Sequence, residues 1–161
     1  MSLIEEYNEK RAKAAGTSAP TLALLDQHGT QTTLKQLLND GMALLFFYSK
    51  DGAPGVSDEL AQLNTYRERF QQLGITPVGI SQDDVETHKK YAEENDLELT
   101  LLADPGNEAS KAYGTWYESG VNARVSFIVS RDQEIVRVYA DQRVRSHIKE
   151  MYTNAKETLV E

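Results

Sequence analysis

The sequence predicts one α/β domain in which helices cover both faces of a mixed sheet. Two apolar runs, residues 43–48 and 75–80, have the continuous hydrophobicity of strands that are buried on both faces. A segment of helical periodicity follows each run. Near the end of the chain, two short apolar segments flank the turn residues RDQE, which indicates a hairpin. Early strand–helix alternation followed by a terminal hairpin is typical of a layered α/β domain.

The first forty residues supply short elements. Residues 3–15 are predicted to form a weakly amphipathic helix that Gly16 ends, so we divide the chain into an N-terminal helical extension (1–16) and a domain (17–161). Gly29 suits a turn between two short strands, and Thr33 is a good N-cap for the helix LKQLL. The run 43–48 is then the candidate for the centre of the sheet.

The remaining elements follow in order. A helix is expected over residues 57–73 and should end at Gly74; it precedes the strand 75–80, a polar helix over 84–95 and a short strand over 97–102. A short helix over 108–113 should end at Gly114. The hairpin strands 125–129 and 135–139 and a final amphipathic helix over 147–160 complete the domain.

Length and charge narrow the class of protein. The 161 residues suit a single domain. A net charge of −8 argues against non-specific binding to nucleic acid or to anionic membranes, because both need clustered Lys and Arg. No apolar run approaches the roughly 20 residues that span a bilayer, and the first residues lack the apolar core of a signal peptide. We therefore expect a cytoplasmic protein.

The segment FFYSKDGAPGVSDEL, residues 46–60, is the most informative part of the chain. A strand ending in FFY, a loop carrying Pro54 and Gly55, and a helix that begins at Ser57 would place residue 56 at a helix N-terminus. Unpaired amides at that point lower the pKa of a thiol. Residue 56 is Val56, and the chain contains no cysteine, so its own residues cannot support disulfide exchange, sulfenic acid chemistry or thiolate metal ligation.

Five segments in this order resemble the peroxiredoxin family, of the alkyl hydroperoxide reductase and thiol-specific antioxidant (AhpC/TSA) type. They are TLALLDQHGTQTTLKQLL, FFYSKDGAPGVSDEL, ITPVGISQDDVETHKKYAEENDL, LTLLADPGNEASKAYGTW and ARVSFIVSRDQEIVRVY. Within the family, the chain is most similar to the monomeric bacterioferritin comigratory protein subgroup. The resemblance implies a thioredoxin-like fold and, for an intact member, a thioredoxin-dependent peroxidase.

The resemblance also assigns roles to positions of the active-site loop. Family peroxidases carry PxxxTxxC, in which Pro shields the site, Thr hydrogen-bonds the peroxide and Cys attacks it. Ser49, Ala53 and Val56 stand at these three positions, and Ala61 stands where the subgroup can carry a resolving cysteine. Arg124 matches the family arginine that supports the thiolate, and Glu59 matches the acidic residue after the nucleophile. Neither retained residue is a nucleophile.

Two classes of function follow. The first is a family member without catalysis that acts as a binding or scaffold module, associating with itself or with another protein. The second is an antioxidant oxidoreductase that works with an external thiol or a partner, or an engineered cysteine-free variant of such an enzyme. Three motif positions are substituted together, which favours natural loss of the site over a single trapping substitution.

Without a thiolate at position 56, another group must balance the positive charge of Arg124. Arg124 and the amides of Gly55 and Val56 could converge on a small anion, such as a carboxylate or phosphate. Alternatively, Glu59 could fold back and neutralise Arg124, which we favour because buried charges are usually paired internally.

Other chemistry-bearing residues are expected to be structural, and we predict no cofactor and no metal site. His28, His88 and His147 should be surface or capping histidines, and Ser57 should cap its helix. Weak cation capture by Asp83, Asp84, Glu93 and Glu94 is the only metal alternative. The aromatic residues Tyr113, Trp116 and Tyr117 are expected at the edge of the core or at a subunit contact.

Overall fold

The computed structural model describes residues 12–117, 120, 122–140 and 144–159 of the chain. Most of the helix predicted for residues 3–15, and with it the N-terminal extension, lies outside these ranges. Residues 12–16 form turns and irregular structure, so the prediction that the helix continues to Gly16 is wrong. Ala12 is buried in the core, and the amide of Lys13 donates to the carbonyl of Tyr113 at 3.0 Å. This segment is therefore tied to the domain by backbone hydrogen bonds.

A seven-stranded mixed sheet organises the domain. Its order is β2-β1-β5-β4-β3-β6-β7, in which β3, β4 and β5 are mutually parallel and the outer strands are antiparallel to their neighbours. The strands are β1 (Ala23–Leu25), β2 (Gln31–Thr33), β3 (Met42–Phe47), β4 (Ile75–Ser81), β5 (Thr100–Ala103), β6 (Val125–Val129) and β7 (Ile135–Tyr139). The predicted mixed sheet is confirmed.

Strand β3 is buried on both faces, as its continuous apolar sequence predicts. Leu45 and Phe47 belong to the core cluster on one face, whereas Leu44, Phe46 and Tyr48 belong to the cluster on the other. The middle strand of the sheet is nevertheless β4, and β3 lies next to it between β4 and β6. Both strands are buried along almost their whole length, so burial alone could not tell which of them is central.

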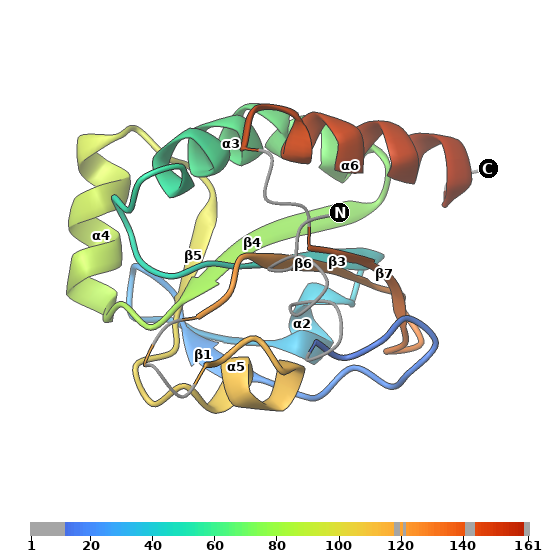
Figure 1. Cartoon of the computed structure of the whole chain (residues 1–161), viewed down its shortest axis with the longest axis horizontal. Helices are drawn as coiled ribbons and strands as arrows, with labels where there is room; N and C mark the ends of the chain where they lie inside the picture. The colour runs from blue at the N-terminus through green and yellow to red at the C-terminus, as the bar shows by residue number, and fades with distance from the viewer. Residues whose placement is uncertain (1–11, 118–119, 121, 141–143, 160–161) are drawn as a thin grey trace.

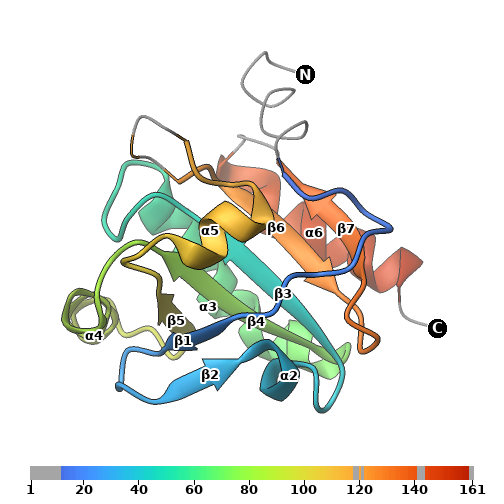
Figure 2. The same ribbon diagram turned by 90° about the horizontal axis from the view of Figure 1, so that it is seen from below.

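Helices lie on both sides of this sheet. Figure 1 shows α3 (Val56–Gln72) and α6 (Val144–Thr158) side by side over one face, while α2 (Leu34–Leu37) and α5 (Glu108–Tyr113) lie under the other. Figure 2, seen from below, shows α5 and α2 in front of the sheet and α3 and α6 behind it. Helix α4 (Val85–Glu94) stands at the side, next to β5.

Local capping residues set several of the boundaries. Thr33 and Gln36 form the reciprocal capping box that begins α2, and Asp84 caps α4 by accepting from the amide of Thr87. Residues 97–99 do not extend β5, contrary to prediction, because the amides of Glu98 and Leu99 donate to the side chain of Asn64 on α3.

The parallel pairing of β3 and β4 places two loops at one edge of the sheet. Phe47 lies opposite Ile80 in the register, so the loops that follow both strands leave the sheet at neighbouring points. These loops carry the residues 49–55 and 82–84, and ligand sites in open α/β sheets form at this edge.

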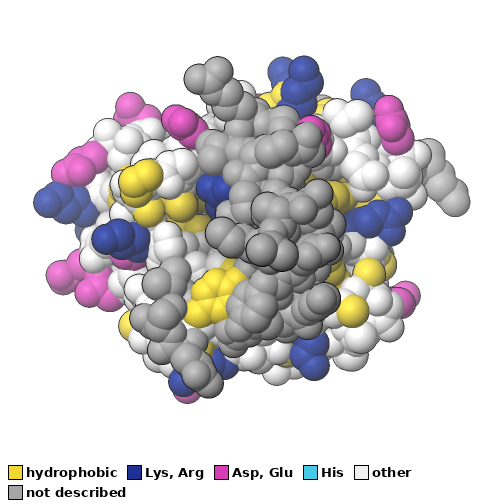
Figure 3. All heavy atoms as spheres, viewed as in Figure 1, with side chains coloured by type: hydrophobic (Ala, Val, Ile, Leu, Met, Phe, Trp, Pro, Cys, Tyr) yellow, Lys and Arg dark blue, Asp and Glu magenta, His cyan; other side chains and the backbone are white. Residues whose placement is uncertain are grey.

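The outer surface carries mixed charge. On the face shown in Figure 3, acidic and basic side chains are interspersed around the described part of the rim. None of the described helices is long and apolar enough to cross a bilayer.

Candidate functional site

Position 56 lies where the sequence predicts, at the N-terminus of α3 directly after the loop that follows β3. Helix α3 begins at Val56 itself, with Gly55 as the N-cap at φ 82°, a left-handed conformation that glycine adopts without strain. Val56 is 4% exposed and packs in the same buried cluster as Tyr48, Ala53 and Leu60. An apolar side chain therefore fills the position that the family resemblance gives to a reactive sulfur.

The neighbouring loop residues complete this packing. Ala53 is buried, and its carbonyl accepts from the amides of Val56 at 3.0 Å and of Ser57 at 3.4 Å. Ser49, in the position of the shielding proline, is half-buried just after β3. The expectation that the Ser57 hydroxyl caps the helix is wrong, because the cap is Gly55 and α3 has no side-chain cap hydrogen bond.

Arg124 and Glu59 form a buried ion pair beside position 56. The Arg124 guanidinium lies 2.8 Å from the Glu59 carboxylate, and the two side chains are 13% and 0% exposed. Of the two outcomes weighed from the sequence, the structure contains the internal pair. Anion binding by Gly55, Val56 and Arg124 stays a prediction, and two features oppose it, since the arginine is already paired and the Val56 amide already donates to Ala53.

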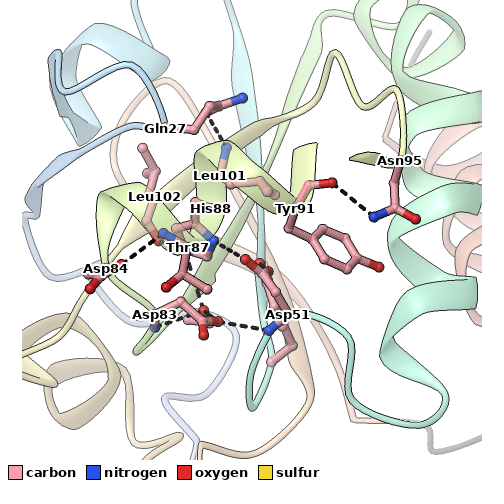
Figure 4. Close-up of polar contacts among 12 residues, drawn as sticks. Gln27, Asp51, Asp83, Asp84, Thr87, His88, Tyr91, Asn95, Leu101 and Leu102 are labelled. Atoms are coloured by element: carbon pink, nitrogen blue, oxygen red, sulfur yellow. Dashed lines mark hydrogen bonds and ion pairs between the residues drawn. The ribbon is translucent and has the colours of Figure 1, made fainter. Parts of the chain in front are cut away.

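A second polar cluster lies under α4, and the sequence reading missed it. His88 is fully buried, which corrects its assignment as a surface or capping residue. Its Nδ1 lies 2.5 Å from Oδ2 of Asp51, and its Nε2 lies 3.2 Å from the carbonyl of Leu102. Asp83 completes the group by accepting from the Asp51 amide at 2.8 Å, and Figure 4 shows the three residues converging.

Two further side chains of this polar cluster are Tyr48 and Ser81. The Tyr48 hydroxyl donates to Asp51 Oδ1 at 2.6 Å, and the Ser81 hydroxyl donates to Asp83 Oδ2 at 2.5 Å. Burial, together with the negative charge of Asp51 and then of Asp83, raises the pKa of Tyr48 well above its usual value. The phenol therefore stays protonated and acts as a donor to the carboxylate.

The sequence held a signal for this cluster that was not used. Asp51 and Asp83 come shortly after two apolar runs that pair as parallel strands, so their loops must meet at one edge of the sheet. His88 lies three residues after Val85 and four before Ala92, on the side of α4 that faces the domain. Together, the two observations indicate a polar cluster where α4 meets this edge of the sheet.

Ser81, His88 and Asp51 follow the order of contacts in a serine hydrolase, and the geometry argues against that chemistry. Ser81 Oγ is 3.5 Å from His88 Nε2, and the serine is fully buried. Its hydroxyl proton points to Asp83, while Nε2 has a shorter contact to the Leu102 carbonyl. A nucleophile must be reachable and must give its proton to the histidine, and this serine does neither.

The other candidates lie apart from both clusters. His28 is exposed in the turn between β1 and β2, as expected, whereas His147 is buried 3.4 Å from the hydroxyl of Ser126, which corrects its assignment. Asp84 caps α4, and Glu93 and Glu94 are exposed near its end. Of the four acids named for cation capture, only Asp83 belongs to a potential metal-ligating group among the described residues.

The aromatic residues Tyr113, Trp116 and Tyr117 differ in burial. Tyr113 is fully buried and its ring contacts those of Phe47 and Phe127, with centroids 5.2 Å away in each case. Trp116 and Tyr117 are half-buried. Tyr113 therefore lies inside the core and not at its edge, whereas Tyr117 packs against the core from outside, as expected. The alternative of a subunit contact stays a prediction.

Comparison with known proteins gives consistent results at the level of family, sequence and structure. The model of the AhpC/TSA family matches residues 15–138. Peroxiredoxin Bcp of Escherichia coli is 30% identical over 141 residues, which cover 83% of this chain and 89% of that protein. Chloroplastic peroxiredoxin Q of Sedum lineare is 29% identical over 138 residues, covering 84% and 74%.

Solved structures share the same fold. The crystal structure of peroxidoxin BcpB from Mycobacterium tuberculosis superposes with a TM-score of 0.82 at 25% identity, covering 89% of this chain and 97% of that one. Peroxiredoxin Q of Xanthomonas campestris reaches a TM-score of 0.82 at 23% identity. The thioredoxin-like fold expected from the five segments is therefore confirmed, and the chain belongs to the AhpC/TSA family of peroxiredoxins, although it contains no cysteine.

Proposed function

We propose that this chain is a non-catalytic member of the AhpC/TSA family that acts as a binding or scaffold module. The observation that carries the proposal is Val56, which occupies the first position of α3 with an apolar, 4% exposed side chain. Peroxide reduction in this family needs an electron pair on sulfur at that point, and valine has none to offer.

The surroundings of Val56 support the same conclusion. An active site without substrate has hydrogen-bond donors already directed at the place where the reacting atoms will bind. Here the Arg124 charge is balanced by Glu59, and the amides of Val56 and Ser57 are used by the Ala53 carbonyl. Ala53 also lacks the hydroxyl that the family loop would direct at a peroxide.

The binding part of the proposal rests on what the chain retains. The seven-stranded sheet and its two buried clusters are complete among the described residues, so the fold persists without the motif that it supports in relatives. A hollow of about 670 Å³ lies between β1, α2 and α5, on the face away from α3. Its lining combines apolar side chains such as Leu22 and Ala109 with Lys35 and Glu108, and interfaces between proteins likewise combine apolar and polar surface.

The second candidate function is an oxidoreductase that uses the thiol of another molecule. A partner's sulfur would have to reach the start of α3, where Val56 and Ala53 are buried. The internal packing of this point makes the binding module the better-supported function.

A peroxide-consumption assay separates the two candidates. The purified chain is incubated with hydrogen peroxide and a chelator, first with thioredoxin and its reductase and then with an excess of a small thiol. The proposal predicts no consumption above the buffer in either arm. Consumption only in the presence of one particular thiol would support the oxidoreductase instead.

A further inference from the structure

The contacts of His88 place one of its ring nitrogens against a carboxylate oxygen of Asp51, with a proton or a metal ion between the two atoms. The carbonyl of Leu102 can only accept, so we assign the hydrogen of a neutral His88 ring to Nε2, which lies 3.2 Å from that carbonyl. In a neutral imidazole the other nitrogen, Nδ1, is then an acceptor. It lies 2.5 Å from Oδ2 of Asp51, which is also an acceptor when ionised. Two acceptors at this distance need a proton or a metal ion between them.

The charge of the cluster also favours a cation. Asp51 and Asp83 bring two carboxylates together, and a shared proton compensates only one of them. Among the described residues, neither aspartate forms an ion pair with a lysine or arginine; the only ion-pair partner is His88.

We propose that Asp51, Asp83 and His88 bind a divalent transition-metal ion of the zinc class. One ring nitrogen of His88 and one carboxylate oxygen from each aspartate lie within 4.8 Å of one another. We assign Nδ1 as the ligand nitrogen because it faces Asp51. One imidazole with two carboxylates suits Zn²⁺, Mn²⁺ or Fe²⁺ better than Ca²⁺ or Mg²⁺, which prefer oxygen ligands alone.

The surroundings already have the features of an outer ligand shell. A metal-binding histidine normally donates its second ring N–H to a carbonyl or carboxylate, and His88 donates to Leu102. The hydroxyls of Tyr48 and Ser81 orient Asp51 and Asp83 in the same way. For ligand bonds of about 2.1 Å, Asp51 and His88 must separate by roughly 1 Å as the ion replaces their shared proton.

Access to the ion comes from one side. His88 and the Asp51 carboxylate are 0% and 2% exposed, whereas Asp83 is half-buried at the surface. The ion therefore enters past Asp83, and water completes its coordination there. Once bound, the ion would link the loops after β3 and β4 to helix α4.

The experiment is calorimetric titration of the full chain with Zn²⁺ after treatment with a chelator, with Mg²⁺ as the contrasting ion. The variants are Asp83→Asn and His88→Gln. The matched control is Asp84→Asn, which changes the adjacent carboxylate in the same way and keeps a good N-cap. We expect one Zn²⁺ per chain in the unmodified and Asp84→Asn proteins, at least about tenfold weaker binding in the two ligand variants, and no comparable binding of Mg²⁺.

Equal affinity of Asp83→Asn and Asp84→Asn for Zn²⁺ would overturn the proposal, as would the absence of binding by the unmodified chain. Because His88→Gln changes a buried residue and could fail to fold, a second measurement uses the unmodified protein. Imidazole NMR signals should shift on addition of one equivalent of Zn²⁺ for His88 and stay unchanged for the exposed His28. A shift confined to His28 would also overturn the proposal.

Discussion

Arg124 and Glu59 lie 2.8 Å apart between the start of β6 and the first turns of α3, and neither side chain is more than 13% exposed. In the family, an arginine at this position supports a thiolate. This chain has no thiolate, and the guanidinium is paired with the carboxylate of Glu59, the other retained family position, on the helix that carries Val56. The pair therefore links α3 to the segment that leads into β6.

Removal of one partner should destabilise the fold. Glu59→Gln leaves the guanidinium without its counter-charge, and we expect a loss of about 3 kcal/mol in the free energy of unfolding, measured with urea. The matched control is Glu98→Gln, which breaks the ion pair to Arg67, where the glutamate is 76% exposed; its cost should stay below about 1 kcal/mol. Similar losses in both variants would show that burial does not strengthen the Glu59 pair.

A cysteine introduced at position 56 should not give this chain efficient peroxidase activity. Val56→Cys could be oxidised once per chain to a sulfenic acid, with reduction of the peroxide to water. Loss of one preorganised donor costs on the order of 100-fold in rate, and both the loop hydroxyl and a free arginine are missing here. We expect the rate constant for the reaction of the Val56→Cys thiol with peroxide, measured by stopped-flow, to lie within about a factor of ten of that for the exposed thiol in Ala61→Cys.

Adding Ala53→Thr to Val56→Cys tests the reason for this low rate. The second substitution returns a hydroxyl to the loop, so the rate should rise above that of Val56→Cys alone. A rate for Val56→Cys that already exceeds the Ala61→Cys rate a thousandfold would contradict the view that the site has lost its machinery.

The Tyr48 hydroxyl should contribute more to stability than that of Tyr113. Both phenols are fully buried, and both donate at 2.6 Å, to the Asp51 carboxylate and to the Pro20 carbonyl respectively. Hydrogen bonds to charged groups contribute about 1.5–3 kcal/mol, against about 0.5–1.5 kcal/mol for neutral pairs. Tyr48→Phe should therefore cost more free energy of unfolding than Tyr113→Phe, and equal costs would argue that Asp51 carries no charge.

Asp104 should make the stability depend on acid pH. Burial raises the pKa of this carboxyl, although the amides of Ser110 and Ala109, at 3.0 and 3.3 Å, act in the opposite direction. The folded state therefore binds the proton more tightly than the unfolded state does. The contribution of Asp104 to stability is largest below its usual value of 3.8 and is lost as the pH rises through the raised pKa.

The test is urea unfolding of the unmodified chain and of Asp104→Asn between neutral pH and pH 4. Relative to the variant, the unmodified chain should gain stability as the pH falls. A relative loss of stability over the same range would mean that the hydrogen bonds outweigh burial and that the sign of the shift is wrong.

The elements of the fold could be predicted because their signals are local. The runs that form β3 and β4, the hairpin β6–β7 and the stops at Gly74 and Gly114 each depend on a few neighbouring residues. Residues 97–99 show the limit of such reasoning. Their apolar pattern suggested a longer β5. However, the side chain of Asn64, more than thirty residues earlier in the chain, accepts hydrogen bonds from the amides of Glu98 and Leu99.

Of the two candidate sites, one could be predicted from local sequence and the other could not. The place of Val56 follows from adjacent segments and from the family resemblance, so it could be predicted. The cluster of Asp51, Asp83 and His88 joins two loops and a helix, and only the parallel pairing of β3 with β4 brings them together. His88 looked like a surface residue because α4 is polar overall, and tertiary packing against β5 decided its burial instead.

The most direct test of the account is the fate of hydrogen peroxide in a chelator-treated solution of the unmodified chain with thioredoxin, its reductase and NADPH. Peroxiredoxin Bcp of Escherichia coli serves as the positive control. We predict that the relative oxidises NADPH catalytically and that this chain leaves both peroxide and NADPH at the buffer level. Repeated turnover by this chain would contradict the account, because it would show that the fold reduces peroxide without a sulfur atom at position 56.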